Sequence, residues 1–144
     1  MFKLCVTRLT LLLCAFSVAA QQSQPPAQAS TPSLYTVPPE AARKANPIKP
    51  TRKSLAQGKK HYLYDCAMCH GDRGDGEGEI AISTKLKIGD FRNPATLKDK
   101  TDGELFYIIQ NGHGQMLPEG NRADPAELWN TVNYIRSLSV KKAQ

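Results

Sequence analysis

Residues 66–70 read Cys-Ala-Met-Cys-His, and no other feature of this sequence constrains the fold as strongly. Two thiols three residues apart on a helical turn face the same way, so both can reach the two vinyl groups of one haem. The histidine that follows is then placed beneath the ring, where it can bind the iron. We therefore predict one covalently attached haem c, with thioether bonds to Cys66 and Cys69 and with His70 as an axial iron ligand.

Three other kinds of site use similar cysteine pairs. A structural zinc ion usually takes four protein ligands, commonly from two such pairs, and the sequence has no second pair after residue 20. A thioredoxin-like redox pair opens a helix after a strand, whereas this motif closes an expected helix. A structural disulfide between the two cysteines is the third alternative. The haem is favoured over all three.

The first twenty residues predict a secretory signal peptide. An apolar run at residues 9–15 follows two basic residues, and small residues follow it up to Ala20. An uncleaved membrane anchor is one alternative, but a spanning helix needs about 20 apolar residues. A lipid anchor at Cys14 is another, which the bulky Leu13 before it disfavours. We expect export to the periplasm, cleavage before Gln21 and no membrane span in the mature chain.

Residues 21–52 are expected to form a proline-rich linker. Seven of the ten prolines lie there, and such a composition buries too little apolar surface to fold alone. Apolar residues at Leu34, Tyr35, Val37 and Ile48 would allow residues 34–52 to dock on the domain that follows.

The net charge of +6 belongs mainly to the segments before residue 53. Residues 53–144 contain thirteen basic and twelve acidic residues. No basic helix and no stripe of interleaved aromatic residues marks this domain as a nucleic-acid binder. We therefore expect redox proteins as partners, and no nucleic acid.

The domain at residues 53–144 is predicted to be all-α, with three main helices and long loops. The first helix opens at a capping-box pattern, Ser54–Gln57. Gly58, Tyr62 and Cys66 then share one of its faces. A lone histidine on this helix, His61, is interpreted as a surface residue.

Two further helices have their own start signals. Thr101–Glu104 is a second capping box, and the helix that it opens is expected to end at Asn111 and Gly112. Asp124 followed by Pro125 starts the third, with an acidic cap and proline in the first turn. Glycine-rich stretches with little strand character lie between the helices.

A six-coordinate haem needs a second axial ligand, and Met116 is the favoured residue. Met68 lies between the two cysteines, too close to reach the opposite face of the ring. Met116 lies in a glycine-rich loop that can approach the iron, and Pro118 would stiffen that loop. His113, in the same loop, is the alternative ligand.

The stretch from Ser54 to Leu138 resembles the class I cytochromes c, and within them the small bacterial haem domains. The resemblance rests on the haem motif, on Asp102–Leu105 and on Trp129–Arg136. It implies the cytochrome c fold, in which the N- and C-terminal helices cross at right angles around one covalent haem. In that crossing Gly58 and Tyr62 match the family's small residue and aromatic on the first helix, with Trp129 and Tyr134 opposite them. Leu117 separates Met116 from Pro118, a departure from the commoner Met-Pro sequence.

The resemblance also implies roles around the haem. A proline carbonyl in the loop after the haem motif accepts the proton on the second nitrogen of the proximal histidine, and Pro94 is assigned this role. Arg92 is interpreted either as a partner of a haem propionate or as a solvated surface arginine.

These observations predict a periplasmic monohaem c-type cytochrome in a respiratory or dehydrogenase chain. It would pass single electrons between protein partners, as a free carrier or as a subunit of a membrane-associated redox complex. Methionine opposite histidine favours ferrous iron and raises the reduction potential. The alternative is a haem enzyme of the peroxidase type, in which Met116 leaves the iron and His113 assists.

Overall fold

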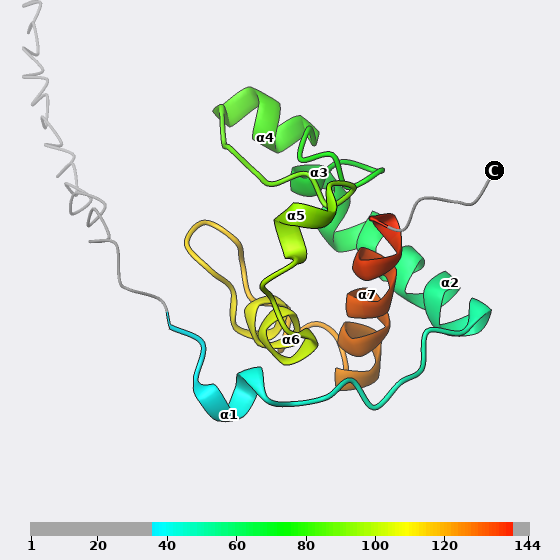
Figure 1. Ribbon diagram of the computed structural model, residues 1–144. Helices are drawn as coiled ribbons and strands as arrows, with labels where there is room; N and C mark the ends of the chain where they lie inside the picture. Colours follow the sequence, from blue (N-terminus) through cyan, green and yellow to red (C-terminus); the bar gives the residue numbers. More distant parts are fainter. Residues whose placement is uncertain (1–35, 140–144) are drawn as a thin grey trace, which may run out of the picture. The chain divides into compact units, whose positions relative to one another are not determined.

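A computed structural model describes residues 36–139 of the chain. The predicted signal peptide and the first part of the linker lie outside the described residues. Within residues 36–139 every regular element is helical (Figure 1), which confirms the predicted all-α class. In this part of the chain no helix has the length and apolar character needed to cross a membrane. The elements are α1 Pro39–Ala42, α2 Arg52–His61, η1 Tyr62–Cys66, α3 Ala67–His70, α4 Glu79–Thr84, α5 Pro94–Leu97, α6 Asp102–Asn111 and α7 Pro125–Leu138.

Helix α2 begins earlier than the sequence predicts. Its N-cap is Thr51, whose hydroxyl accepts a hydrogen bond from the Ser54 amide at 3.2 Å. Ser54 is buried inside the first turn, so the predicted Ser54–Gln57 capping box is wrong. Thr51 serves the same purpose, because a threonine oxygen satisfies an amide that has no partner within the helix.

The haem motif ends a continuous helical run. Helix α2 passes into the π-helical segment η1 and then into α3, so the run extends from Arg52 to His70. In η1 the Ala67 amide bonds to the Tyr62 carbonyl, five residues back. Such π segments are frequent at functional sites, and this one stands directly before the second half of the motif.

The capping box predicted at Thr101 and the aspartate cap predicted at Asp124 are both confirmed, and the second proves to be a full capping box as well. At α6 the Thr101 hydroxyl accepts from the Glu104 amide at 3.1 Å, and the Glu104 carboxylate accepts from the Thr101 amide at 2.6 Å. At α7 Asp124 and Glu127 repeat the arrangement at 2.8 and 3.1 Å. Gly112 ends α6 with a φ of 78°, a left-handed conformation that favours glycine.

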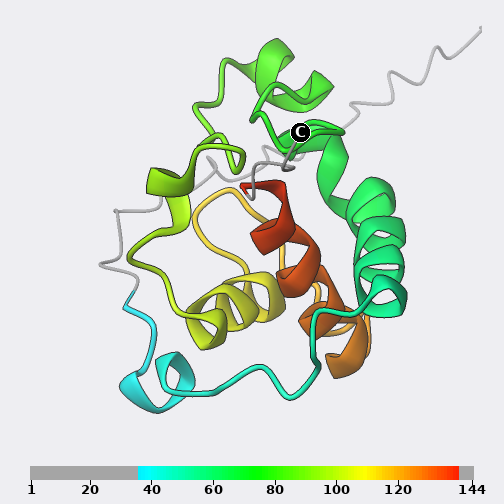
Figure 2. The ribbon, with the colours of Figure 1, turned by 45° about the vertical axis from the view of Figure 1, so that its right-hand side comes forward.

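Helices α2 and α7 cross in close contact (Figure 2), and this is the most extensive packing between any two helices described. A Cβ added at Gly58 would overlap the carbonyl of Asn130 and press on the Thr131 amide. One turn later Tyr62, which is fully buried, packs its ring 5.2 Å from that of Tyr134. The predicted use of a small residue and aromatic rings at this crossing is therefore present for Gly58, Tyr62 and Tyr134, whereas Trp129 stacks on Phe106 of α6.

The segment before α2 lies against α6 and α7. Helix α1 packs on α6, and the Asn46 amide donates to the Trp129 carbonyl at 3.1 Å and to the Asn133 side chain at 3.0 Å. The Asn133 amide in turn donates to the Ile48 carbonyl at 2.8 Å and to the Ser54 hydroxyl at 2.9 Å. These hydrogen bonds join the segment, α2 and α7 at one corner of the domain.

Arg136 joins three helical segments at the other end of α7. Its Nε donates to Asp102 at 2.9 Å, its Nη1 donates to the Leu97 carbonyl at 2.9 Å, and its Nη2 donates to the Lys100 carbonyl. The guanidinium therefore satisfies acceptors at the end of α5 and at the start of α6 together.

The Gly58 contact predicts the effect of adding one methyl group. We expect Gly58→Ala to lower the free energy of unfolding of the holoprotein by about 2 kcal/mol, because overpacking against a rigid backbone outweighs the better helix propensity of alanine. Denaturation in guanidinium chloride measures the change. Lys59→Ala, at the exposed neighbouring position, should change it by less than about 0.5 kcal/mol. Equal effects of the two substitutions would contradict the close crossing.

Candidate functional site

The five-residue haem motif lies where the long helical run ends. Cys66 is the last residue of η1 and is 9% exposed, whereas Cys69 in α3 is half-buried. Both are free thiols, so the structural disulfide is not formed in this structure. His70 is the last residue of α3. The helix thus brings two thiols and an imidazole into a single turn.

Burial keeps the Cys66 thiol protonated. Desolvation, together with the negative charges of Glu119 and Asp65, raises the pKa of Cys66 to about 12, while Arg122 acts in the opposite direction. A nucleophilic cysteine of a thioredoxin-like pair has a lowered pKa instead. The electrostatics therefore disfavour the redox-pair alternative.

His70 offers a neutral imidazole inside the domain. Burial lowers its pKa, because the charged form loses hydration. The ring stacks on Phe91 with centroids 4.9 Å apart and planes at 19°. Its Nδ1 is buried and has no hydrogen-bond partner. A neutral imidazole held by stacking is the form that binds a metal.

Pro94 and Arg92, the two residues assigned from the loop after the motif, both lie at the surface, which for Arg92 was one of the two interpretations. Pro94 is the exposed first residue of α5, and His70 Nδ1 has no hydrogen bond to its carbonyl. Arg92 is exposed and directs its Nε and Nη2 at the carboxylate of Asp90, at 2.9 and 2.8 Å. This pairing raises the pKa of Arg92 and lowers that of Asp90. The predicted Pro94–His70 hydrogen bond is therefore absent, and Arg92 has a carboxylate partner within the chain.

The loop between α6 and α7 turns Met116 inward. The amides and carbonyls of His113 and Met116 pair at 3.0 and 2.9 Å, which closes a tight turn. Met116 is partly buried and packs against the hydrophobic core, whereas His113 and Leu117 are exposed. Of the two candidate ligands in the loop, only Met116 thus faces the core.

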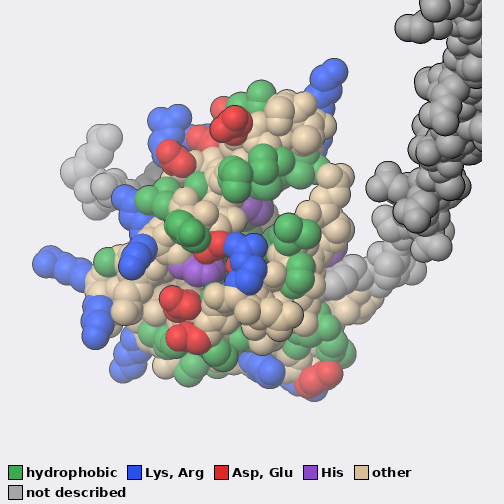
Figure 3. All heavy atoms as spheres, turned by 180° about the vertical axis from the view of Figure 1, so that it is seen from behind, with side chains coloured by type: hydrophobic (Ala, Val, Ile, Leu, Met, Phe, Trp, Pro, Cys, Tyr) green, Lys and Arg blue, Asp and Glu red, His purple; other side chains and the backbone are tan. Residues whose placement is uncertain are grey.

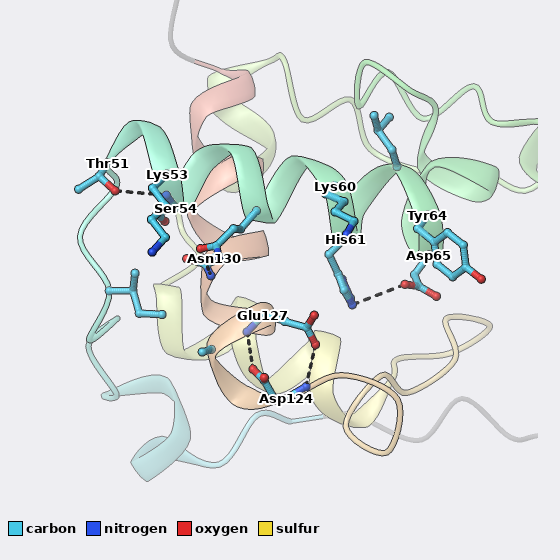
Figure 4. Close-up of a pocket in the computed structure, with 14 residues that line it drawn as sticks. Thr51, Lys53, Ser54, Lys60, His61, Tyr64, Asp65, Asp124, Glu127 and Asn130 are labelled. Atoms are coloured by element: carbon cyan, nitrogen blue, oxygen red, sulfur yellow. Dashed lines mark hydrogen bonds and ion pairs between the residues drawn. The ribbon is translucent and has the colours of Figure 1, made fainter.

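A cluster of charged side chains beside the motif was missed by sequence reasoning. His61, interpreted above as a surface residue, has a side chain only 8% exposed. Its Nε2 lies 3.6 Å from Asp65, one turn further along the helical run (Figure 4). Glu119 and Arg122, from the α6–α7 loop, complete the cluster. The spacing of His61 and Asp65 was a usable signal, but nothing local pointed to residues more than fifty positions away.

The residues present fit a covalent c-type haem. The donor set comprises two free thiols, a neutral imidazole with one orphaned nitrogen, and an inward-facing thioether. Aromatic side chains lie nearby, with Phe91 on the imidazole and Phe106 stacked on Trp129 at 4.1 Å. Figure 3 shows one face of the molecule, which is hollowed, with histidine side chains set between apolar and charged groups.

Two surface grooves lie away from this donor set. One, of about 860 Å³, runs between α2 and the start of α7 and has His61 and Asp65 among its lining residues. The other, of about 1100 Å³, lies where residues 42–50 cross α6 and α7. Neither is lined by the motif cysteines, His70 or Met116. The haem assignment therefore rests on the donor set and not on either groove.

Comparison with known proteins gives a match over most of the predicted domain. The family model described as "Cytochrome C oxidase, cbb3-type, subunit III" matches residues 53–135. A curated protein named cbb3-type cytochrome c oxidase subunit FixP, from Bradyrhizobium diazoefficiens, is 30% identical over 93 residues. That alignment covers 62% of this chain and 30% of the relative, so the chain spans less than a third of that protein's length.

Two solved structures share the fold. One belongs to the Kuenenia stuttgartiensis reducing HAO-like protein complex Kustc0457/Kustc0458, with a TM-score of 0.56 and 24% identity over 64% of this chain and 46% of that one. The other is the KustC0563 c-type cytochrome, with a TM-score of 0.52 and 24% identity over 58% of this chain and 98% of that one. At this identity the likeness concerns the fold alone.

The donor set predicts what removal of both thiols will do. Mass spectrometry of the intact holoprotein should show the polypeptide plus one haem, and Cys66→Ala with Cys69→Ala should show the polypeptide alone. Thioether bonds survive denaturation, so both spectra are taken under denaturing conditions. Retention of the haem mass by the double variant would contradict the assignment.

Proposed function

The chain belongs to the cbb3-type cytochrome c oxidase subunit III family and has the cytochrome c fold, and on this premise we propose that it is a periplasmic monohaem electron carrier. In this proposal it passes single electrons between protein partners, with His70 and Met116 as the two iron ligands. When bound, the haem supplies an iron that alternates between the ferrous and ferric states. The observation that carries the proposal is the inward-facing Met116 in the loop after α6.

The residues of this chain have distinct tasks in the proposal. Cys66 and Cys69 fix the group covalently to a helix that is itself held against α7 at Gly58. His70, whose ring stacks on Phe91, would supply an imidazole nitrogen to the iron. Since His70 and Met116 would both hold the iron, the haem would supply electron transfer with little rearrangement of the chain, which suits a carrier.

The roles proposed for Pro94 and Arg92 each require a contact that differs from the one in the structure. His70 Nδ1 needs an acceptor, and we assign the Pro94 carbonyl to it, which requires the start of α5 to approach the imidazole. Arg92 binds Asp90 at the surface. It would have to exchange this partner to reach a haem propionate.

The partners are proposed to be redox proteins, including a membrane-associated oxidase complex. The family description and the name of the FixP relative both refer to a cbb3-type cytochrome c oxidase. Export through the predicted signal peptide would place the domain in the periplasm. Either a free carrier or a complex subunit is compatible with a linker before the domain.

Peroxidase chemistry is the alternative function, and it would need Met116 to leave the iron. His113, its proposed assistant, is exposed and its backbone is paired with that of Met116. A haem peroxidase also needs an acid–base group directed at the open iron position. The inward position of Met116 therefore favours electron transfer.

The optical spectrum tests the ligand assignment. The ferric holoprotein should show the weak absorption band near the red end of the spectrum that is typical of methionine–iron ligation. Met116→Ala should abolish this band. His113→Ala, in the same turn, is the matched control and should retain it. Absence of the band from the wild type, or its survival in Met116→Ala, would contradict the assignment of Met116 as the sixth ligand.

A further inference from the structure

We propose that His61, Asp65, Glu119 and Arg122 form a clamp that holds the Met116 loop against the helical run carrying the haem motif. These four residues, the loop clamp, are positioning residues that act on the iron through Met116. This inference rests on the proposed function, because it concerns the strength of the Met116–iron bond.

The loop clamp joins the helical run that ends at His70 to the loop that carries Met116. Asp65 directly precedes Cys66, and His61 lies one turn before Asp65. Glu119 and Arg122 lie in the α6–α7 loop shortly after Met116. A bond between the two pairs therefore fixes the loop relative to the helix on which the haem is anchored.

Arg122 makes the decisive contacts. Its Nη2 donates to the Asp65 carboxylate, and its Nε lies 3.4 Å from Glu119 Oε2. The second distance is short enough for an ion pair, but Oε2 has no hydrogen bond of good geometry. One guanidinium thus bridges a carboxylate of η1 and a carboxylate of the loop.

The cluster is enclosed on its carboxylate side. The side chains of Glu119 and Asp65 are 7% and 13% exposed, whereas that of Arg122 is 52% exposed. Burial raises the pKa of Glu119, and the Asp65 carboxylate acts in the same direction, while Arg122 and His61 oppose the shift. Two nearly buried carboxylates within reach of each other repel unless a cation lies between them. Arg122 supplies that cation.

A metal ion would be the other occupant of such a group, since His61, Asp65 and Glu119 have potential ligand atoms within 4.8 Å of one another. Both carboxylates, however, are already paired with the Arg122 guanidinium. A metal would have to displace it. The structure therefore favours an ion-pair clamp.

The backbone of the α6–α7 loop is anchored to the end of α6. The amides of Glu119 and Gly120 donate to the carbonyls of Ile109 and Gln110 at the end of α6, each at 2.9 Å. The Arg122 amide donates to the Glu119 carbonyl at 2.9 Å. The loop backbone thus belongs to α6, and the clamp is its described ionic link to the motif helix.

Displacement of Met116 by imidazole measures the strength of the clamp. Ferric holoprotein is titrated with imidazole, and the loss of the red-end band is followed. We expect Arg122→Gln to bind imidazole about tenfold more tightly, because the two carboxylates then repel and the loop opens more easily. The exposure of Arg122 limits the effect, since water screens part of the interaction. Arg122→Lys, which keeps the charge, should remain within about threefold of the wild type.

A matched control separates the clamp from general stability. Arg136 also pairs with a carboxylate, Asp102, at 2.9 Å, and it likewise joins separate segments. Arg136→Gln should lower the guanidinium chloride midpoint but leave imidazole affinity within about threefold. Equal gains in imidazole affinity for Arg122→Gln and Arg136→Gln would overturn the proposal, as would an unchanged affinity in Arg122→Gln.

Two further variants keep the test decisive if Arg122→Gln fails to yield holoprotein. Glu119→Gln removes one charge with little change of shape, and we expect a threefold to tenfold gain in imidazole affinity. Asp65→Asn combined with Arg122→Gln should be less perturbed than Arg122→Gln alone, because the repulsion is removed with the charge. Unchanged affinity in Glu119→Gln would then contradict the clamp.

The two proposals fail in different ways. Absence of the red-end band from the wild type would refute methionine ligation itself. A wild type with the band, lost in Met116→Ala, combined with a silent Arg122→Gln, would refute only the clamp.

Discussion

The contact between Gly58 and the backbone of α7 fixes the helix on which the functional residues lie. Because glycine has no side chain, α2 approaches the Asn130 carbonyl closely, and each further turn of the run takes its position from that contact. Tyr62 follows, fully buried, with its hydroxyl donating to the Gly71 carbonyl at 2.9 Å beyond the motif. Cys66 comes one turn later. The crossing therefore determines where the cysteines and His70 are presented.

Elements with local signals could be predicted from the sequence, and those that depend on distant contacts could not. The capping boxes at Thr101 and Asp124 lie entirely within four residues, and both are present. At the first helix the same reasoning chose Ser54, because the competing cap, Thr51, lacks an acidic or amide residue three positions later. The short helices α1, α4 and α5 were missed, since four to six residues give too little periodicity to detect. The π segment leaves no sequence signal.

In the candidate site, too, features with a local sequence signal could be predicted and those that depend on distant contacts could not. The motif residues were identified from their spacing, and their burial and free thiols agree with that interpretation. The residues around the motif were harder to predict, because their contacts come from distant parts of the chain such as the α6–α7 loop. His61 is buried by residues near position 119, and the Asp90 partner of Arg92 became visible only in the folded chain. The Pro94 assignment came from family resemblance, and its hydrogen bond to His70 is absent from the structure. The sequence alone predicts the candidate ligands, whereas the residues packed around them had to be read from the fold.

The proposed electron carrier depends on Met116 and His70, which would together hold the haem iron. The most direct measurement is a proton–carbon NMR spectrum of the reduced holoprotein labelled with carbon-13 at the methionine methyl groups. A methyl group above the centre of a haem is shifted far upfield by the ring current. Ligation by Met116 predicts one such methyl resonance, assigned to Met116 by its loss in Met116→Leu, with Met68 at an ordinary position. If both methyl groups resonate at ordinary positions, Met116 is not the ligand.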